Sequence, residues 1–247
     1  IVCDNRIPFI KGVLEPWAEV VYLPGADTTA SDVSDADAII TRTRTKCNEA
    51  LLKGSKVKVI ASATLGYDHI DTAWCGSAGI LWENAPGCNS SSVKQYVTSV
   101  LCTLAQRRGL DLGKMTIGVV GVGNVGSKVA EAARILGMDV LLCDPPRARR
   151  EGPSGFCSLG EITERADIVT IHVPLSKDGE DATWHLFDAA RIASMGSGRI
   201  LINSSRGAVV DNNALKEALA SGRLEAAVLD TWEHEPDIDR DLLDIMG

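Results

Sequence analysis

The chain has 247 residues, of which 45% are hydrophobic and 23% charged, a composition typical of a globular protein and not of a disordered one. Its formal net charge of −8 and its lack of a basic stripe argue against a nucleic acid or an anionic membrane as partner. No apolar run approaches the length of a membrane span and no signal-peptide pattern opens the chain, so we expect a cytoplasmic protein. The seven cysteines are scattered and lack C-x-x-C spacing, which predicts reduced thiols and no zinc or other metal site.

The first third of the chain alternates short apolar runs with helical stretches. Turn signals such as Pro24-Gly25 separate these runs. Continuous runs of Val and Ile predict parallel strands covered on both faces. The predicted strands are Ile1–Asp4, Val20–Leu23, Ala38–Arg42, Val57–Ala63 and Ile80–Glu83.

A long amphipathic helix is expected next. Apolar residues recur from Val93 to Leu104 at spacings of three and four, which is the period of a helix with one buried face. The serines at 90–92 are expected to cap its start. We interpret it as a helix that connects two domains.

The second half repeats the alternation of strands and helices, including helices over Val125–Leu136 and Asn213–Ala220. This order predicts an α/β fold with a doubly wound parallel sheet in each half. A ligand is then expected at the carboxyl ends of the strands, in a cleft between the domains. The predicted strands are Ile117–Gly121, Val140–Asp144, Ile168–Val173, Arg199–Asn203 and Ala226–Asp230.

The most informative motif is a glycine-rich turn at the start of this second half. An apolar run leads into Gly121, Gly123 and Gly126, a helical pattern follows, and Asp144 stands 18 residues after the last glycine. Gly121 permits the tight turn, Gly123 lets the backbone approach a pyrophosphate, and Gly126 lets the helix pack against the strand. The helix N-terminus attracts the phosphates, and Asp144 can accept hydrogen bonds from ribose hydroxyls. A carboxylate repels a 2′-phosphate, which favours NAD over NADP.

Two further runs, Asn203–Asp211 and Val228–Pro236, carry a more specific pattern. With Glu235 placed 29 residues after Arg206, the chain resembles the D-isomer-specific 2-hydroxyacid dehydrogenase family over essentially its whole length. The resemblance implies that Arg206 binds the carboxylate of the substrate. It also implies that Glu235 hydrogen-bonds a catalytic histidine.

Other contacts are implied by the resemblance alone. Thr43 and Thr64 are expected to touch the substrate. Residues 1–88 would form a flavodoxin-like substrate domain, whose remainder lies outside this chain, and residues 89–247 a linker helix with a Rossmann NAD-binding domain. The expected NAD contacts beyond the glycines are Asn124, Val125, Asp144, Val173, Ser204, Ser205, Arg206 and Asp230.

Four short segments narrow the resemblance to one branch of the family. They are Asp4–Pro8, Ala85–Asn89, Cys143–Arg147 and Pro174–Gly179. Members of this branch oxidise 4-phospho-D-erythronate on the route to vitamin B6. The resemblance therefore implies NAD-dependent oxidation of a small phosphorylated 2-hydroxy acid, and we expect a homodimer.

This chemistry requires a hydride acceptor, a base and a cation that holds the carboxylate. The guanidinium of Arg206 is always charged and binds carboxylates in a two-pronged geometry. Glu235 beside an imidazole would raise the pKa of that imidazole and fix its tautomer. In the family the histidine base follows this motif, so we expect it beyond Gly247. The four histidines of the chain are not expected to replace it: His69, His172, His185 and His234.

Several alternatives stay open from the sequence. One alternative is another D-2-hydroxy acid as substrate, such as 3-phosphoglycerate. A second is a non-catalytic NAD-sensing module of the corepressor type. Arg147, which closely follows Asp144, leaves NADP open as the cofactor. Arg42 and Arg44 are candidates for binding a substrate phosphate, but exposed charges at a strand end are equally common.

Overall fold

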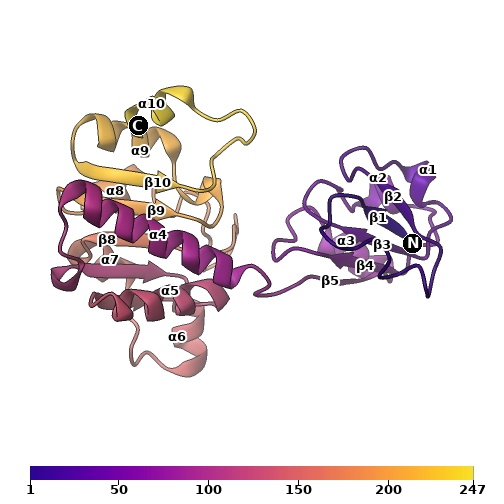
Figure 1. The fold of residues 1–247 in the computed structure, drawn as a ribbon, viewed down its shortest axis with the longest axis horizontal. Coiled ribbons are helices and arrows are strands. Elements are labelled where there is room, and N and C mark those ends of the chain that lie inside the picture. The colour runs from indigo at the N-terminus through magenta and orange to yellow at the C-terminus, as the bar shows by residue number, and fades with distance from the viewer. Residues whose placement is uncertain (247) are drawn as a thin grey trace. The chain divides into compact units, whose positions relative to one another are not determined.

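The computed structural model describes residues 1–246. The chain divides into two compact units, Ile1–Asn89, here called unit 1, and Ser90–Gly247, called unit 2 (Figure 1). Each unit is built around its own five-stranded parallel sheet. The expected α/β fold with two doubly wound parallel sheets is therefore confirmed.

Unit 1 combines short strands with short helices. Its helices are α1 (Ala30–Val33), α2 (Glu49–Leu52) and α3 (Thr72–Ser77). Its strands are β1 (Val2–Asp4), β2 (Val21–Leu23), β3 (Ala38–Thr41), β4 (Val59–Ser62) and β5 (Leu81–Glu83).

The core of unit 1 lies on one face of its sheet. Ile39 and Ile60 are paired across β3 and β4, and both are buried in one cluster with residues from all three helices. On the opposite face, Val59 is paired with Leu81, and these side chains are 39% and 70% exposed. The expectation of a sheet covered on both faces is therefore wrong for this part of the sheet, because side chains alternate between faces and the described residues cover one face here.

Unit 2 opens with the long helix α4 (Ser90–Arg108) and a short 3-10 turn, η1 (Leu112–Lys114). Its strands are β6 (Thr116–Val120), β7 (Asp139–Cys143), β8 (Ile168–Ile171), β9 (Arg199–Asn203) and β10 (Leu224–Leu229). Its other helices are α5 (Asn124–Ile135), α6 (Pro145–Glu151), α7 (Leu159–Arg165), α8 (Ala189–Ser194), η2 (Gly207–Val209), α9 (Asn212–Ala220) and α10 (Arg240–Met246).

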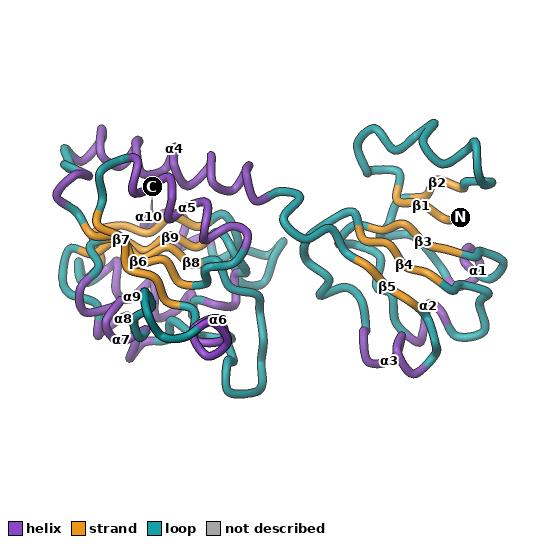
Figure 2. The backbone as a smooth tube through the Cα atoms, turned by 90° about the horizontal axis from the view of Figure 1, so that it is seen from below, coloured by secondary structure: helices purple, strands orange, loops and turns teal. Residues whose placement is uncertain are grey.

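The sheet of unit 2 is buried on both faces. Along β9, Ile200 and Ile202 face the cluster that contains α4 and α5, whereas Leu201 between them faces the cluster that contains α7, α8 and α9. Figure 2 shows these two layers of helices on opposite sides of the sheet. Because both faces are covered, the central positions Ile200, Leu201 and Ile202 are all apolar, which is why the sequence has a continuous apolar run here.

Both sheets have the same strand order. In unit 2 the order is β10-β9-β8-β6-β7, and in unit 1 it is β2-β1-β3-β4-β5. The chain reverses its direction of winding between β6 and β8 in unit 2, and between β1 and β3 in unit 1. At such switch points the loops leave the sheet in opposite directions and open a crevice at the carboxyl ends of the strands.

Two local expectations need correction. The serines at 90–92 do not cap α4 from outside, since the helix begins at Ser90 and they form its first turn. Strand β8 ends at Ile171, so His172 and Val173 follow the strand and do not belong to it. These two residues therefore stand in the loop at the switch point, where side chains can face a ligand.

The interface between α4 and the sheet gives a test of this core. Leu101 is 1% exposed, and we expect Leu101→Ala to lower the free energy of unfolding of unit 2 by about 2–5 kcal/mol because it leaves a cavity. Ile135→Ala is the control, since this side chain on α5 is 80% exposed and its loss should change stability by no more than about 0.5 kcal/mol. Denaturant unfolding measures both; equal effects would contradict the packing.

Candidate active site

The glycine turn between β6 and α5 has the backbone that its sequence predicts. Gly121 has φ of +85°, a conformation that side chains rarely adopt, and its N–H donates to the carbonyl of Cys143 at 2.8 Å. A Cβ at Gly126 would lie 1.9 Å from the carbonyl oxygen of Gly121. The first and third glycines are therefore required by the fold itself.

Gly123 differs from these two glycines. Its φ of −80° suits any residue, and a Cβ built on it meets no atom within 4 Å. The described fold gives no reason for a glycine here, at the residue that caps the 12-residue helix α5. A pyrophosphate resting on the helix N-terminus does give one, because it needs the backbone to be bare. The turn therefore fits a dinucleotide.

Asp144 stands at the end of β7 and holds two backbone groups. Its carboxylate accepts hydrogen bonds from the N–H of Val122 at 2.8 Å and from the N–H of Arg147 at 2.9 Å. The guanidinium of Arg147 is engaged with the carbonyl of Val122 at 2.7 Å and with Glu151 at 2.7 Å. The arginine that left NADP open is thus bound to protein groups, and Asp144 keeps lone pairs for ribose hydroxyls.

A cavity of about 440 Å³ opens beside this turn. Its lining includes four of the residues expected to contact NAD, together with His172 and the loop around Thr183. Those four are Gly121, Gly123, Asp144 and Val173. The cavity lies where β6 and β8 end, which is the switch point of the sheet. Asn124, Val125 and Gly126 belong to the first turn of α5 and do not line it.

His172 connects this cavity to the next loop of the site. Its Nε2 lies 3.0 Å from Oγ1 of Thr170 and its Nδ1 lies 3.2 Å from Oγ of Ser204. Burial lowers the pKa of His172 to about 4, so the ring is neutral at pH 7. A neutral imidazole bridging two hydroxyls fixes the side chain of Ser204. The sequence did not single out this role, because strand β8 was expected to extend to Val173.

The loop after β9 is held by a fully buried amide. Oδ1 of Asn203 accepts hydrogen bonds from the N–H of Ser205 at 3.0 Å and from its hydroxyl at 2.8 Å. The amide nitrogen of Asn203 donates to the carbonyl of Arg206 at 2.9 Å. The backbone of Ser204, Ser205 and Arg206 is thereby fixed at the carboxyl end of the sheet. The guanidinium of Arg206 is half-buried and donates to the carbonyl of Ser205 at 2.9 Å.

The loop after β10 packs directly on the Arg206 loop. A Cβ on Gly207 would lie 2.0 Å from the carbonyl of Trp232, so only glycine permits this approach. The N–H of Asp230 donates to the carbonyl of Asn203 at 2.9 Å, and Asp230 itself is exposed. Glu235 is also exposed, and its Oε1 accepts a hydrogen bond from the N–H of Trp232 at 2.7 Å.

In unit 1 the two expected substrate residues follow neighbouring strands. Thr43 is exposed in the loop after β3, at the switch point of this sheet. Thr64 follows β4, and its hydroxyl bonds Ser62 at 2.9 Å and the carbonyl of Gly66 at 3.0 Å. Nearby, Arg42 donates to the carbonyl of Arg6 at 3.2 Å.

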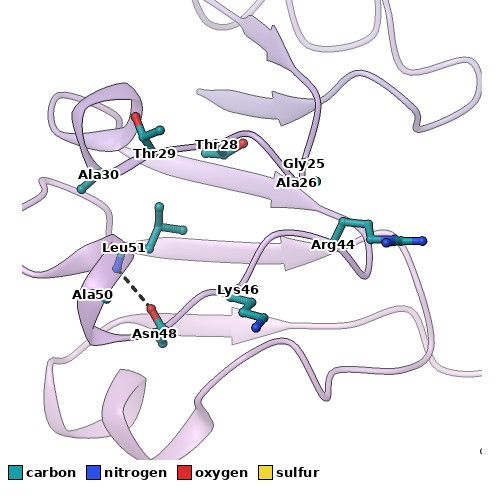
Figure 3. Close-up of a pocket in the computed structure, with 10 residues that line it drawn as sticks. All are labelled: Gly25, Ala26, Thr28, Thr29, Ala30, Arg44, Lys46, Asn48, Ala50 and Leu51. Carbon is teal, nitrogen blue, oxygen red and sulfur yellow. Dashed lines mark hydrogen bonds between the residues drawn. The ribbon is translucent and has the colours of Figure 1, made fainter. Parts of the chain in front are cut away.

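A shallow hollow of about 470 Å³ also lies in unit 1, between α1 and α2 (Figure 3). Arg44 and Lys46 border it, but the guanidinium of Arg44 points away from the hydroxyls of Thr28 and Thr29 (Figure 3). The hydroxyl of Thr29 is bonded to Asp32 at 2.6 Å. The cations and hydroxyls do not converge, so we assign no ligand to this hollow.

The comparison with known proteins agrees with this geometry. The profile of the D-isomer specific 2-hydroxyacid dehydrogenase NAD binding domain matches residues 90–246. Erythronate-4-phosphate dehydrogenase of Bacteroides fragilis is 56% identical over 245 residues, which cover 99% of this chain and 70% of that protein. The chain belongs to the D-isomer-specific 2-hydroxyacid dehydrogenase family. It is therefore an oxidoreductase, and its cofactor is NAD.

Other relatives extend the comparison. Erythronate-4-phosphate dehydrogenase of Porphyromonas gingivalis is 45% identical over 99% of this chain and 67% of that protein. The crystal structure of a D-lactate dehydrogenase from Aquifex aeolicus, complexed with NAD and lactic acid, matches with a TM-score of 0.83 and 26% identity. That match covers 99% of this chain and 84% of the solved one.

Two further properties of the described chain concern its helices and its cysteines. None of the helices formed by residues 1–246 is long and apolar enough to cross a membrane. All seven cysteines are free thiols.

The contrast between the glycines yields a prediction. We expect Gly123→Ala to change thermal stability little, at most about 1 kcal/mol for a helix cap, yet to weaken NAD binding by about tenfold or more. Gly126→Ala should instead destabilise the fold, because its Cβ meets the Gly121 carbonyl. Calorimetric titration with NAD and thermal unfolding separate the two; unchanged NAD affinity in Gly123→Ala would contradict the assignment of the turn.

The half-buried His172 predicts a dependence of stability on pH. Its pKa of about 4 lies below the ordinary 6.5, so between these values the unfolded chain binds a proton that the folded chain lacks. The contribution is complete above pH 6.5 and is lost as the pH falls towards 4, by up to about 3 kcal/mol. His172→Asn should flatten this part of the profile, as measured by denaturant unfolding at several pH values. Parallel profiles for both proteins would show that the folded protein does not hold this ring in its neutral form.

Proposed function

We propose that this protein oxidises 4-phospho-D-erythronate to 2-oxo-3-hydroxy-4-phosphobutanoate with NAD, as a step in the synthesis of pyridoxal 5′-phosphate. The proposal is supported by relatives named erythronate-4-phosphate dehydrogenase that are 45% and 56% identical over 99% of the chain. The observation that carries it in the structure is the fixed loop that presents Arg206 after β9, in the same sheet as β6, which leads into the dinucleotide turn.

Arg206 is proposed to hold the carboxylate of the substrate. The side chain of Asn203 holds the backbone of this loop through hydrogen bonds to the Arg206 carbonyl and the Ser205 N–H. The guanidinium therefore extends from a fixed backbone. A guanidinium can bind both carboxylate oxygens at once, which orients the carbon that carries the hydroxyl. NAD, when bound, accepts the hydride from that carbon.

Glu235 is proposed to orient an imidazole that removes the hydroxyl proton. Its carboxylate is exposed and has one described bond, to the N–H of Trp232, so an oxygen remains available for an imidazole N–H. The proposal gives the role of base to neither His172, which is half-buried and neutral, nor His185, which is bonded to Glu233.

Further parts of the proposal concern substrate contacts and cellular state. Thr43 and Thr64 are proposed to contact substrate from the strand ends of unit 1, and Arg42 beside Thr43 to contribute to phosphate binding. We also propose that the protein acts as a homodimer in the cytoplasm, where its free thiols suit a reducing compartment. Sedimentation of the full-length protein tests the dimer.

Steady-state formation of NADH tests the substrate. The full-length protein is expected to oxidise 4-phospho-D-erythronate and to leave 3-phosphoglycerate largely unchanged. Activity confined to 3-phosphoglycerate would overturn the substrate and keep the family.

Substitution of Arg206 tests the carboxylate clamp. Arg206→Ala is expected to lower kcat/KM by about a thousandfold, because a charge-assisted two-pronged contact is lost in the transition state. The affinity for NAD should change by less than about threefold. Arg223→Ala serves as the matched control, because it removes an exposed arginine of the same unit whose side chain has one described hydrogen bond, to the carbonyl of Ala193. A kcat/KM equal to that of the control would rule out the clamp.

A further inference from the structure

We propose that His185 is a positioning residue: through Glu233 it fixes the loop that carries Glu235 against the loop that carries Arg206. The inference deepens the proposed function, since it rests on the roles given there to Arg206 and Glu235. Neither His185 nor Glu233 stood among the expected site residues.

The central observation is a short, shielded hydrogen bond. Nε2 of His185 lies 2.6 Å from Oε1 of Glu233, and the two side chains are 21% and 12% exposed. The other oxygen of Glu233 accepts a hydrogen bond from the N–H of Asn212 at 3.3 Å, and Nδ1 of His185 lies 3.8 Å from Oδ2 of Asp211. Both oxygens of Glu233 are thus held by groups outside its own loop, which gives the carboxylate a fixed position.

His185 itself is anchored from several sides. Its ring is stacked on that of Trp184, with centroids 3.9 Å apart and planes inclined by 14°. The backbone N–H of His185 donates to the carbonyl of Ala208 at 2.8 Å, which ties His185 to the turn that follows Arg206. Its φ of +48° lies in the left-handed region, so the backbone is held in an unfavourable conformation to place this ring. The ring is therefore a fixed support that belongs structurally to the Arg206 loop.

The Glu235 loop depends on this support. Gly207 contacts the backbone of Trp232 and Glu233 with no room for a Cβ, so the two loops meet where His185 binds Glu233. Beyond this contact the chain turns through His234, whose φ is +61°, and reaches Glu235 only two residues after Glu233. The exposed carboxylate of Glu235 thus takes its position from a loop pinned at Glu233.

The hydrogen bond within the Glu235 loop does not by itself fix the position of Glu235 relative to Arg206. Glu235 accepts from Trp232 of its own loop, and this bond holds the shape of the turn but not its position relative to Arg206. The described contacts that tie the Glu235 loop to its surroundings include the Gly207 packing and the side chain of Glu233, in addition to the Asp230 N–H at the end of β10. Removing the carboxylate of Glu233 should therefore release Glu235 while leaving the glycine turn and the NAD cavity intact.

Substitutions at both partners test the proposal in the full-length protein. Glu233→Ala and His185→Ala are expected to lower kcat about tenfold or more, with the dissociation constant for NAD changed by less than about twofold. Glu233→Gln retains an oxygen that accepts from Nε2–H and should keep kcat within about threefold of the wild type. Glu225→Ala, which removes an exposed glutamate of β10 paired with Arg108, is the matched control.

A double-substitution cycle separates positioning from general stability. If His185 acts through Glu235, His185→Ala should cost little further activity in a Glu235→Ala background, because the group that it positions is already absent. Multiplicative losses, or a wild-type kcat in Glu233→Ala, would overturn the proposal. If Glu233→Ala fails to fold, a cycle that combines His185→Gln with Glu235→Ala tests the proposal instead. The assays use whichever 2-hydroxy acid the wild-type protein oxidises, so a wrong substrate refutes the proposed function and leaves this test valid.

Discussion

The carbonyl oxygen of Gly121 lies where any side chain at position 126 would have to begin. This contact lets α5 start directly against the end of β6, so that the first N–H groups of the helix face the crevice between β6 and β8. The cavity, the position of Asp144 and the hydrogen bond from Gly121 to the end of β7 all depend on this approach. A bulkier residue would displace the helix and remove the phosphate site with it.

The remainder of the site is assembled by neutral or paired polar groups that leave the sheet at neighbouring strand ends. Asn203 holds the loop after β9, His172 reaches from the end of β8 to Ser204, and the N–H of Asp230 continues the pairing from β10 to β9. Burying a polar group costs free energy unless it forms a hydrogen bond. The Asn203 amide, the His172 ring and the Asp230 N–H each form one. The result is a rigid edge on which Arg206 is displayed.

Much of this arrangement could be predicted from local sequence, and the reasons are physical. The apolar run of β9 was expected with its observed bounds, because both faces are buried and polar residues stop it abruptly. Gly121 and Gly126 could be interpreted because the positive φ of Gly121 and the contact of Gly126 with the Gly121 carbonyl arise within a few residues of chain. The C-terminal end of β8 was placed two residues too late, because His172 still donates a backbone hydrogen bond to Val120 of β6 and Val173 is apolar, although the strand ends at Ile171.

Contacts between residues far apart in the sequence could not be predicted from such patterns. His185 and Glu233 are separated by 48 residues, and His172 and Ser204 by 32. The sequence spacing of these side chains does not predict that they touch, because the order of strands in the sheet determines which residues come together. The same holds for unit 1, where the exposure of Val59 and Leu81 follows from which face the helices cover.

Asp144 shows how recognition and architecture can share one side chain. Its carboxylate caps α6 and also holds the Val122 N–H of the glycine turn, besides facing the cavity expected to hold the ribose. Loss of such a cap costs about 1 kcal/mol before any effect on the cofactor is counted. A lineage that drifted towards NADP would have to replace this residue and restore both backbone contacts in the same interval. In this chain, cofactor preference and local folding are therefore coupled through one carboxylate, and a change of the first disturbs the second.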